Sequence, residues 1–212
     1  MTDDFIDRVY ECAVVPEMWP ALLDDLAEMT GAQGGILFSA RSALVWTSSK
    51  SLEDVFAEYV EDGWFERCSR RLCLMTQTQP SFFVEQDFWT SGQLDTDPIY
   101  RDFFRPRGLG WSAGTGLRLP TGDNIVFSIE RRFDQGPVER AHVDMLNTLR
   151  PHLARRALVT ARLGLQRAKG ASDALIALRV PALLLDATGR VIEANDLVEG
   201  LSGLMRWAAQ GR

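Results

Sequence analysis

The two histidines, His142 and His152, are the side chains best suited to acid–base chemistry near neutral pH. Both fall in one expected helix, and ten positions separate them by about 80° around its axis. A hydrolase would need a nucleophile beside a positioned base. His142 instead falls among the apolar positions of this helix, so we interpret the histidines as core or interface residues that bond to a neighbour.

The three cysteines, Cys12, Cys68 and Cys73, do not form a recognisable pattern. Their number is odd and no two are spaced as CxxC, which disfavours both a disulfide framework and a four-cysteine zinc site. On one helix, Cys68 and Cys73 would point about 140° apart, which disfavours a redox pair. We expect reduced, partly buried thiols.

Common catalytic and phosphate-binding motifs are also missing, because HExxH, GxxxxGK[ST] and GxGxxG do not occur. The acidic residues are plentiful but scattered along the chain. The sequence therefore predicts no enzyme, no metal site and no cofactor. A hydrolase that acts on a small ligand is the weaker alternative.

The composition limits where such a chain works and what it binds. The 212 residues are 46% hydrophobic, which is enough for a sizeable core, and the net charge is −6, the wrong sign for gripping a phosphate backbone. No apolar run approaches the roughly 20 residues of a membrane span, and the chain begins with the acidic Met-Thr-Asp-Asp. We expect a cytoplasmic protein with no membrane contact, and no DNA binding by these residues alone.

The order of the expected elements indicates an α+β domain with a mixed, mostly antiparallel sheet flanked by helices. Two helices come first and end near Gly31, and two strands meet around residues 40–42. A helix over 51–71, a strand over 81–88 and a short helix stopped by Pro106 follow. A hairpin pairs 111–119 with 124–132.

A long helix follows this sheet. From Val138 its apolar positions cover an arc of about 120°, and Pro151 on the opposite side predicts a bend. Because such a helix outruns a small domain, its stripe favours helix-on-helix packing in a symmetric homodimer. The candidate dimerisation residues are Leu149, Leu153, Ala157 and Leu163.

Aromatic side chains crowd the middle of the chain, where they could wall an apolar ligand pocket or simply fill the core. The candidate ligand-binding residues are Tyr59, Trp64, Phe65, Trp89, Tyr100, Phe103 and Trp111, with Phe104 in the same group.

Four segments in a fixed order resemble the sensory half of bacterial regulators with a LuxR-type helix-turn-helix. They are IDRVYECAVVPEMWPALLDDLAEMTGAQGGILF, DPIYRDFFRPRGLGWSAGTGLRL, LRPHLARRAL and LLLDATGRVIEANDL. The resemblance implies a GAF-like sensory domain over 1–136, a long signalling helix over 137–170, and the beginning of a PAS-like segment over 171–212 that opens with a β-hairpin at 181–194. It also implies that the sequence stops before the helix-turn-helix.

The function that this resemblance implies is ligand sensing and dimerisation in a DNA-binding transcriptional regulator, with DNA contacted only through the missing helix-turn-helix. The stretch YVEDGWFERC is also similar to the pocket helix of acyl-homoserine-lactone receptors. Those receptors place an Asp after the aromatic pair, where this chain has Glu66-Arg67-Cys68, so the ligand stays unassigned. The alternative is a stand-alone GAF-like binding module.

Overall fold

The computed structural model describes residues 2–12, 14–40, 44–118, 124–185 and 191–201. No side chains are described for residues 2, 3, 40, 44, 45, 157–169, 184, 185, 191–193 and 199–201. The turns predicted around 40–42, 120–123 and 187–190 fall wholly or in part outside the described residues. The chain divides into unit 1, Met1–Val159, and unit 2, Thr160–Arg212.

Unit 1 is built on a five-stranded antiparallel sheet with the order β2-β1-β5-β4-β3. Its strands are β1 (Gly34–Ala40), β2 (Leu44–Ser48), β3 (Phe83–Val84), β4 (Leu109–Arg118) and β5 (Asn124–Arg132). The predicted hairpin is confirmed, because β4 pairs with β5 in a register that places Thr115 opposite Phe127. The predicted α+β class with a mostly antiparallel sheet is confirmed as well.

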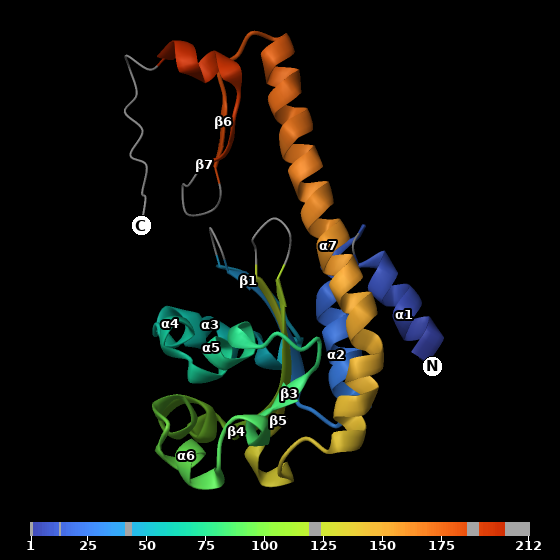
Figure 1. The fold of residues 1–212 in the computed structure, drawn as a ribbon, viewed down its shortest axis with the longest axis vertical. Helices are drawn as coiled ribbons and strands as arrows, with labels where there is room; N and C mark the ends of the chain where they lie inside the picture. Colours follow the sequence, from blue (N-terminus) through green and yellow to red (C-terminus); the bar gives the residue numbers. More distant parts are fainter. Residues whose placement is uncertain (1, 13, 41–43, 119–123, 186–190, 202–212) are drawn as a thin grey trace. The chain divides into compact units, whose positions relative to one another are not determined.

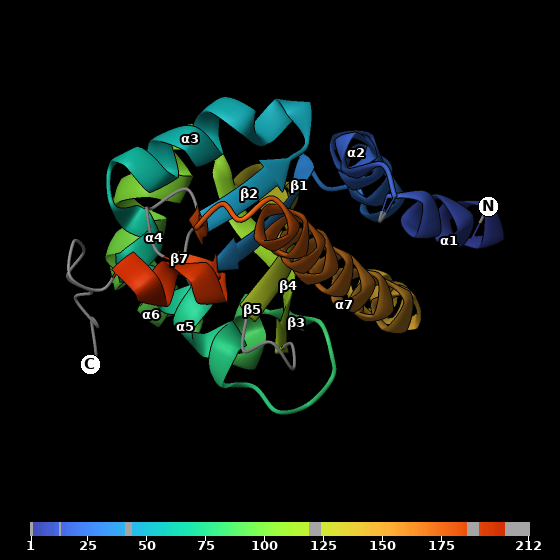
Figure 2. The same ribbon diagram turned by 90° about the horizontal axis from the view of Figure 1, so that it is seen from above.

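Helices cover both faces of this sheet (Figures 1 and 2). On one face lie α1 (Thr2–Glu11), α2 (Trp19–Thr30) and the first turns of α7 (Arg140–Ala177). On the other lie α3 (Glu53–Glu61), α4 (Trp64–Arg67), α5 (Ser69–Thr76), α6 (Ser91–Thr96) and the π-helical turn Ile99–Phe104. Short 3₁₀ turns at 16–18, 50–52, 85–87, 105–107 and 133–135 join these elements.

The alternation of side chains along β5 divides the interior into two cores, since successive residues point to opposite faces. Phe127 and Ile129 belong to the core beneath α1, α2 and α7, which we call the α7-side core, whereas Val126 belongs to the core beneath α3 to α6, the cavity-side core. The α7-side core comprises Phe5, Val9, Cys12, Trp19, Leu22, Leu26, Phe82, Val84, Ala113, Leu117, Phe127, Ile129, Val138, Val143, Leu146, Leu149 and Leu153. The cavity-side core comprises Ile36, Phe38, Leu52, Phe56, Tyr59, Phe65, Cys68, Leu74, Leu94, Ile99, Tyr100, Phe103, Phe104, Leu109 and Val126.

The single helix predicted over 51–71 is wrong, because the chain breaks twice. Gly63 adopts a left-handed conformation with φ 69°, and Cys68 is extended with ψ 108°. Only glycine adopts the first conformation without strain. The result is three short helices, α3, α4 and α5, that wrap over the sheet.

Two further predicted elements differ from the structure. The strand predicted over 81–88 is reduced to Phe83–Val84, because residues 85–87 form a 3₁₀ turn. Pro106 does not stop its helix but lies inside the 3₁₀ turn Arg105–Arg107, which ends at the left-handed Gly108. Proline is tolerated there because the first turn of a helix leaves its N–H groups unpaired.

Unit 2 holds the end of α7 and a two-stranded sheet of β6 (Leu183–Leu185) and β7 (Val191–Ala194). The strands pair antiparallel where the sequence predicts a hairpin. The buried Asn195 ties their ends together, since its Oδ1 accepts from the Ala182 N–H at 3.1 Å and its Nδ2 donates to the Val180 carbonyl at 2.9 Å. A 3₁₀ turn over Asp196–Leu201 follows.

Candidate ligand-binding site

A small cavity lies between the sheet and helices α3 to α5 in unit 1. Its volume is about 30 Å³, above the roughly 10 to 15 Å³ that a cavity needs to hold one water molecule. Most of its wall is apolar, with polar groups at one side. The lining residues are Ile36, Phe38, Leu52, Val55, Phe56, Tyr59, Cys68, Arg70, Arg71, Leu74, Phe103, Phe104, Leu109, Val126, Ser128 and Glu130.

The structure brings two of the seven predicted ligand-binding residues, Tyr59 and Phe103, to this cavity, together with Phe104. The rings of Tyr59 and Phe103 meet edge to face, 5.5 Å apart. The other predicted aromatic residues pack in or against the cavity-side core without lining the cavity: Trp64, Phe65, Trp89, Tyr100 and Trp111.

Trp111 lies apart from the cavity for a specific reason. Its ring stacks on Phe133 at 5.9 Å with an interplanar angle of 14°, and its Nε1 donates to the Phe133 carbonyl at 3.1 Å. A buried or half-buried indole N–H needs such an acceptor. The Trp111 N–H therefore has its acceptor near the first residues of β4, and the ring does not line the cavity.

Glycines in β4 set the depth of the cavity by letting α5 approach the sheet. A Cβ added at Gly114 would come within 2.8 Å of the Leu74 side chain, and one at Gly116 would come within 2.9 Å of the Leu74 backbone oxygen. Both contacts are too short. The first would displace the Leu74 side chain, and the second, which meets backbone, would push α5 away. The close approach brings the start of α5, with Arg70, to the sheet.

The break at Cys68 determines which way α5 presents Arg70. The Cys68 Sγ accepts a hydrogen bond from the Arg71 N–H at 3.4 Å and so caps the first turn of α5. The Ser69 hydroxyl donates to Asp97 Oδ2 at 2.7 Å, which fixes the same turn to the segment after α6. With the turn held, the Arg70 side chain enters the interior and is 11% exposed.

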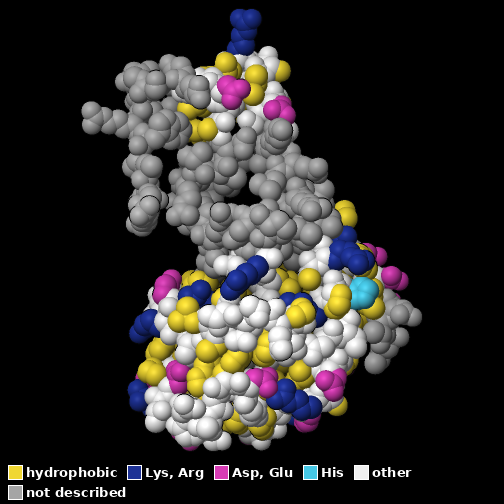
Figure 3. All heavy atoms as spheres, viewed as in Figure 1, with side chains coloured by type: hydrophobic (Ala, Val, Ile, Leu, Met, Phe, Trp, Pro, Cys, Tyr) yellow, Lys and Arg dark blue, Asp and Glu magenta, His cyan; other side chains and the backbone are white. Residues whose placement is uncertain are grey.

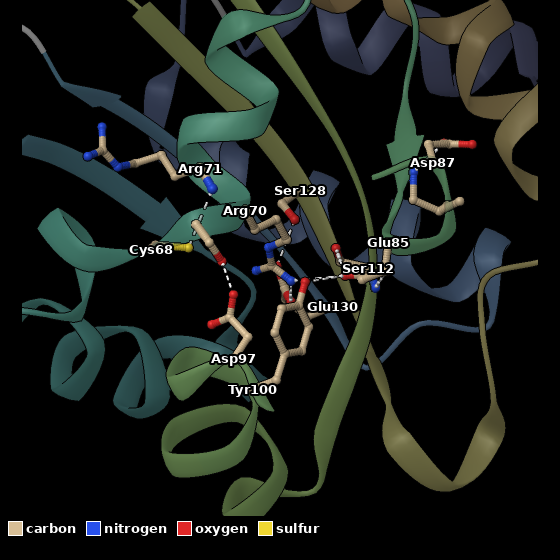
Figure 4. Close-up of polar contacts among 12 residues, drawn as sticks. Cys68, Arg70, Arg71, Glu85, Asp87, Asp97, Tyr100, Ser112, Ser128 and Glu130 are labelled. Atoms are coloured by element: carbon tan, nitrogen blue, oxygen red, sulfur yellow. Dashed lines mark hydrogen bonds and ion pairs between the residues drawn. The ribbon is translucent and has the colours of Figure 1, made fainter. Parts of the chain in front are cut away.

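Arg70 contacts two buried carboxylates on the sheet side (Figure 4). Its Nη1 donates to Glu130 Oε2 at 3.0 Å and its Nη2 to Glu130 Oε1 at 2.8 Å, a bidentate pair. Nη1 also lies 3.5 Å from Glu85 Oε1. The guanidinium covers the Phe104 ring at 4.5 Å, which links the charges to the aromatic wall.

Hydroxyl and amide groups complete this polar cluster. Glu85 accepts from the Ser112 hydroxyl at 2.6 Å, the Ser112 N–H at 2.9 Å and the Tyr100 hydroxyl at 3.2 Å. The Ser128 hydroxyl donates to Glu130 Oε1 at 2.7 Å. The side chains of Glu85 and Glu130 are 1% and 2% exposed, so protein groups replace the water that they lose on folding.

Burial and charge shift the titration of this cluster. Burial raises the pKa of Glu130, and the Arg70 guanidinium opposes that shift. Burial disfavours the charged form of Arg70, yet the Glu130 carboxylate raises the pKa of that guanidinium well above its ordinary value. Burial, together with Glu85, raises the pKa of the Tyr100 hydroxyl, which therefore stays a donor at neutral pH.

The sequence reasoning missed Arg70, Glu85 and Glu130. Arg70 and Glu130 are 60 positions apart, so no local motif joins them. One signal was present in IVFSIERR: Ser128 and Glu130 alternate with apolar residues at the same period as the inward-facing Val126. A glutamate at an inward position of a strand indicates a buried partner.

One pattern typical of serine hydrolases was also overlooked. Residues 110–114 read GWSAG, which fits GxSxG. In a hydrolase this serine stands on a sharp turn between a strand and a helix, whereas Ser112 lies within β4 and donates to Glu85. The histidines bond to neighbours, as expected, His142 to Glu139 at 2.8 Å and His152 to Tyr10 at 3.1 Å. The expected core position is wrong for His142, whose side chain is 33% exposed.

The three thiols are free, and Cys12 and Cys68 are buried, as predicted. In the described part of the chain, no helix is long and apolar enough to cross a membrane. The same residues contain no cluster of three or more potential metal ligands.

The predicted dimerisation residues occupy different environments. Leu149 and Leu153 are buried in the α7-side core, 0% and 1% exposed, so unit 1 itself covers them. The apolar stripe of α7 therefore packs against its own domain at least as far as Leu153. The side chains of Ala157 and Leu163 lie outside the described residues.

This arrangement is the fold of the ligand-binding domains of LuxR-family transcription factors. The N-acylhomoserine-lactone-dependent LuxR family transcription factor CepR2 from Burkholderia cenocepacia superposes with a TM-score of 0.53 at 14% identity, over 76% of this chain and 96% of that one. The LBD domain of VqsR from Pseudomonas aeruginosa gives 0.56 at 13% identity, with the same two coverages.

SdiA from Escherichia coli gives a TM-score of 0.55 at 11% identity, over 85% of each chain. At identities this low, the TM-scores establish a shared fold. No protein-family model matches the sequence, and no curated protein matches it either.

Proposed function

We propose that this chain is the ligand-sensing region of a LuxR-type transcriptional regulator. The observation that carries the proposal is the cavity beneath α3 to α5, with apolar walls and a hydrogen-bonded polar cluster at one side. Ligand sites combine these two features, since apolar walls supply affinity and a few placed polar groups supply orientation. The shared fold with LuxR-type ligand-binding domains supports the same function.

The cavity must enlarge to admit a ligand. At about 30 Å³ it is a tenth or less of the roughly 300 to 1,000 Å³ of ordinary small-molecule sites. The covering layer is made of three short helices joined at Gly63 and Cys68. Such breaks allow α4 and α5 to move as separate pieces, so we expect ligand entry to displace them from β4.

The hydrolase alternative has one feature in its favour, the GxSxG pattern, and the geometry of Ser112 opposes it. A hydroxyl that donates to a buried carboxylate, on a strand and with both histidines bonded elsewhere, lacks the positioned imidazole of a serine nucleophile. We therefore favour binding without catalysis. A stand-alone GAF-like module would use the same cavity.

The experiment compares two valines that are both 2% exposed on opposite faces of the sheet, Val126 and Val143. Val126→Phe fills the cavity, and Val143→Phe adds the same side-chain volume to the α7-side core. Each substitution is expected to lower the free energy of unfolding by about 1 to 3 kcal/mol. Each protein is incubated with an organic extract of bacterial culture medium and gel-filtered. Mass spectrometry then identifies the small molecules retained.

The wild type and Val143→Phe should retain the same molecule, and Val126→Phe should lose it. Thermal unfolding shows that both variants are folded. Retention of no molecule by the wild type, or equal retention by Val126→Phe, would contradict the proposal.

The homodimer and the DNA-binding helix-turn-helix stay predictions. Because unit 1 already buries Leu153, Leu153→Asp should unfold the domain rather than separate two subunits. Leu163→Asp should instead convert a dimer to a folded monomer. Light scattering and circular dichroism distinguish these outcomes, and a wild-type monomer at micromolar concentration would refute the dimer.

A further inference from the structure

The polar cluster beside the cavity contains more negative than positive charge. Two carboxylates, Glu85 and Glu130, share the single guanidinium of Arg70. All three side chains are almost fully removed from water. Burial disfavours the uncompensated carboxylate and raises the pKa of Glu130, so either a proton or a cationic group from a ligand restores the balance.

Arg71 does not supply the missing charge. It lines the cavity, but its Nε donates to the Phe65 carbonyl at 2.9 Å and its guanidinium stacks on the Phe65 ring at 4.5 Å. Figure 4 shows this guanidinium directed away from Glu85 and Glu130. Its bond goes to the α4 backbone, so among the described residues Arg70 is the cation that pairs with the two carboxylates.

Glu130 lines the cavity and keeps unused acceptor capacity. A carboxylate offers about four acceptor positions. Its Oε1 accepts from Arg70 and Ser128, and its Oε2 accepts only from Arg70 among the described residues. A donor entering the cavity therefore finds an open position on Oε2.

From this imbalance we infer that the cavity takes an apolar molecule with a cationic nitrogen, an amine or amidine, whose N–H groups donate to Glu130. The inference rests on the proposed binding function and names its ligand class. The ammonium or amidinium group supplies the charge that Arg70 alone lacks. The aromatic wall of Tyr59, Phe103 and Phe104 receives the apolar body and also attracts a cation.

An anionic ligand would increase the imbalance. A carboxylate or phosphate in the same place would add a third negative charge beside two that are already buried, and like charges in a medium of low dielectric repel strongly. A neutral alcohol would leave the imbalance unchanged. An amine, an alcohol and a carboxylate that share one alkyl tail should therefore bind with different affinities.

The experiment titrates the whole chain with hexylamine, hexanol and hexanoate by calorimetry. Hexylamine should bind about tenfold or more tightly than hexanol, since a charge-assisted contact contributes about 1.5 to 3 kcal/mol, and hexanoate should bind weakest. Val126→Phe should abolish the binding and Val143→Phe should leave it unchanged, which excludes attraction to the exposed acidic surface. Glu130→Gln should reduce hexylamine affinity by about tenfold and leave hexanol affinity as it is.

The outcomes separate the two proposals. Equal affinities for the three compounds, or a preference for hexanoate, with loss of binding in Val126→Phe, would overturn the cationic ligand and keep the binding site. Binding that Val126→Phe does not weaken would overturn the cavity as the site. The comparison of head groups on the wild type needs no substitution, so a failure of Glu130→Gln to fold leaves the test intact.

Discussion

The two faces of the central sheet bury cores of different chemistry. The α7-side core joins apolar side chains of α1, α2 and α7 to those of the strands. The cavity-side core surrounds a void and borders two carboxylates and a guanidinium. Because apolar packing stabilises a fold and buried charges contribute little net stability, we interpret the first core as structural and the second as the binding face.

Their surroundings differ in the same way. Helices α1 and α2 and the long α7 cover the α7-side core, whereas the short helices α3, α4, α5 and α6 and a π-helical turn cover the cavity-side core. Figure 3 shows the outer surface of unit 1 on one side, where hydrophobic side chains lie among scattered acidic and basic ones.

The largest expected effect follows from removing Arg70. Arg70→Met leaves Glu85 and Glu130 buried without a cation, and breaking a buried pair in this way costs about 3 to 5 kcal/mol. Urea unfolding measures the loss. Arg70→Lys, which keeps the charge but not the bidentate geometry, should lose less. Equal losses, or a loss below about 1 kcal/mol, would show that the carboxylates do not depend on this cation.

A cavity made in the opposite core should affect stability alone. Leu149 is 0% exposed, and Leu149→Ala should reduce the free energy of unfolding by about 3 kcal/mol. Hexylamine affinity of the folded variant should equal that of the wild type, because the sheet separates Leu149 from the cavity. A change in affinity beyond the measurement error would mean that the two cores are coupled.

A smaller effect is expected from the hydroxyl of Tyr100. Tyr100→Phe removes one of three donors to Glu85 and should cost about 1 to 2 kcal/mol in thermal unfolding. Tyr10→Phe is the matched control, since Tyr10 bonds to His152 at the half-buried edge of α7 and should cost less. The reverse order would argue against a buried network around Glu85.

The smallest effect concerns the pH dependence of stability near the start of α7. Hydrogen bonds from Arg131 at 2.6 and 3.0 Å lower the pKa of Glu139 to about 2. A carboxyl whose pKa is depressed by folding stabilises the fold above its ordinary pKa near 4.5, and this contribution is lost as the pH falls toward 2. The side chain of Glu139 is 54% exposed, so solvent screening limits the effect to about 1 kcal/mol or less.

The measurement is the free energy of unfolding from about pH 6 down to pH 2 for the wild type and Glu139→Gln. The wild type should lose its excess stability over the variant as the pH falls below 4.5. Parallel curves would show that Arg131 and Glu139 do not pair in solution.

The elements predicted correctly from the sequence are those with a clear hydrophobic periodicity. The β4–β5 hairpin and the long helix follow from alternation and from a one-sided apolar stripe. The break at Gly63 was missed because WFERC continues a plausible helical pattern, and only the backbone conformation shows that the helix ends. The GAF-like and PAS-like assignments and the boundaries at 137 and 171 stay predictions.

The candidate site could be predicted only in part for a related reason. Aromatic crowding pointed to the correct layer, and the structure brings Tyr59 and Phe103 to the cavity. Composition cannot show which aromatic side chains border a void and which fill the core. The charged cluster depends on pairing between segments far apart in the chain, and tertiary contacts of this kind leave no local signature.

The most direct test of the binding face is methyl NMR of the wild-type chain titrated with hexylamine. The methyl signals of Ile36, Leu74 and Val126, which line the cavity, should shift progressively and saturate. Those of Val143, Leu146 and Leu149 in the α7-side core should keep their positions. Shifts centred on the α7-side core, or no saturable shift at Ile36, Leu74 and Val126, would contradict the assignment of binding to the cavity-side face.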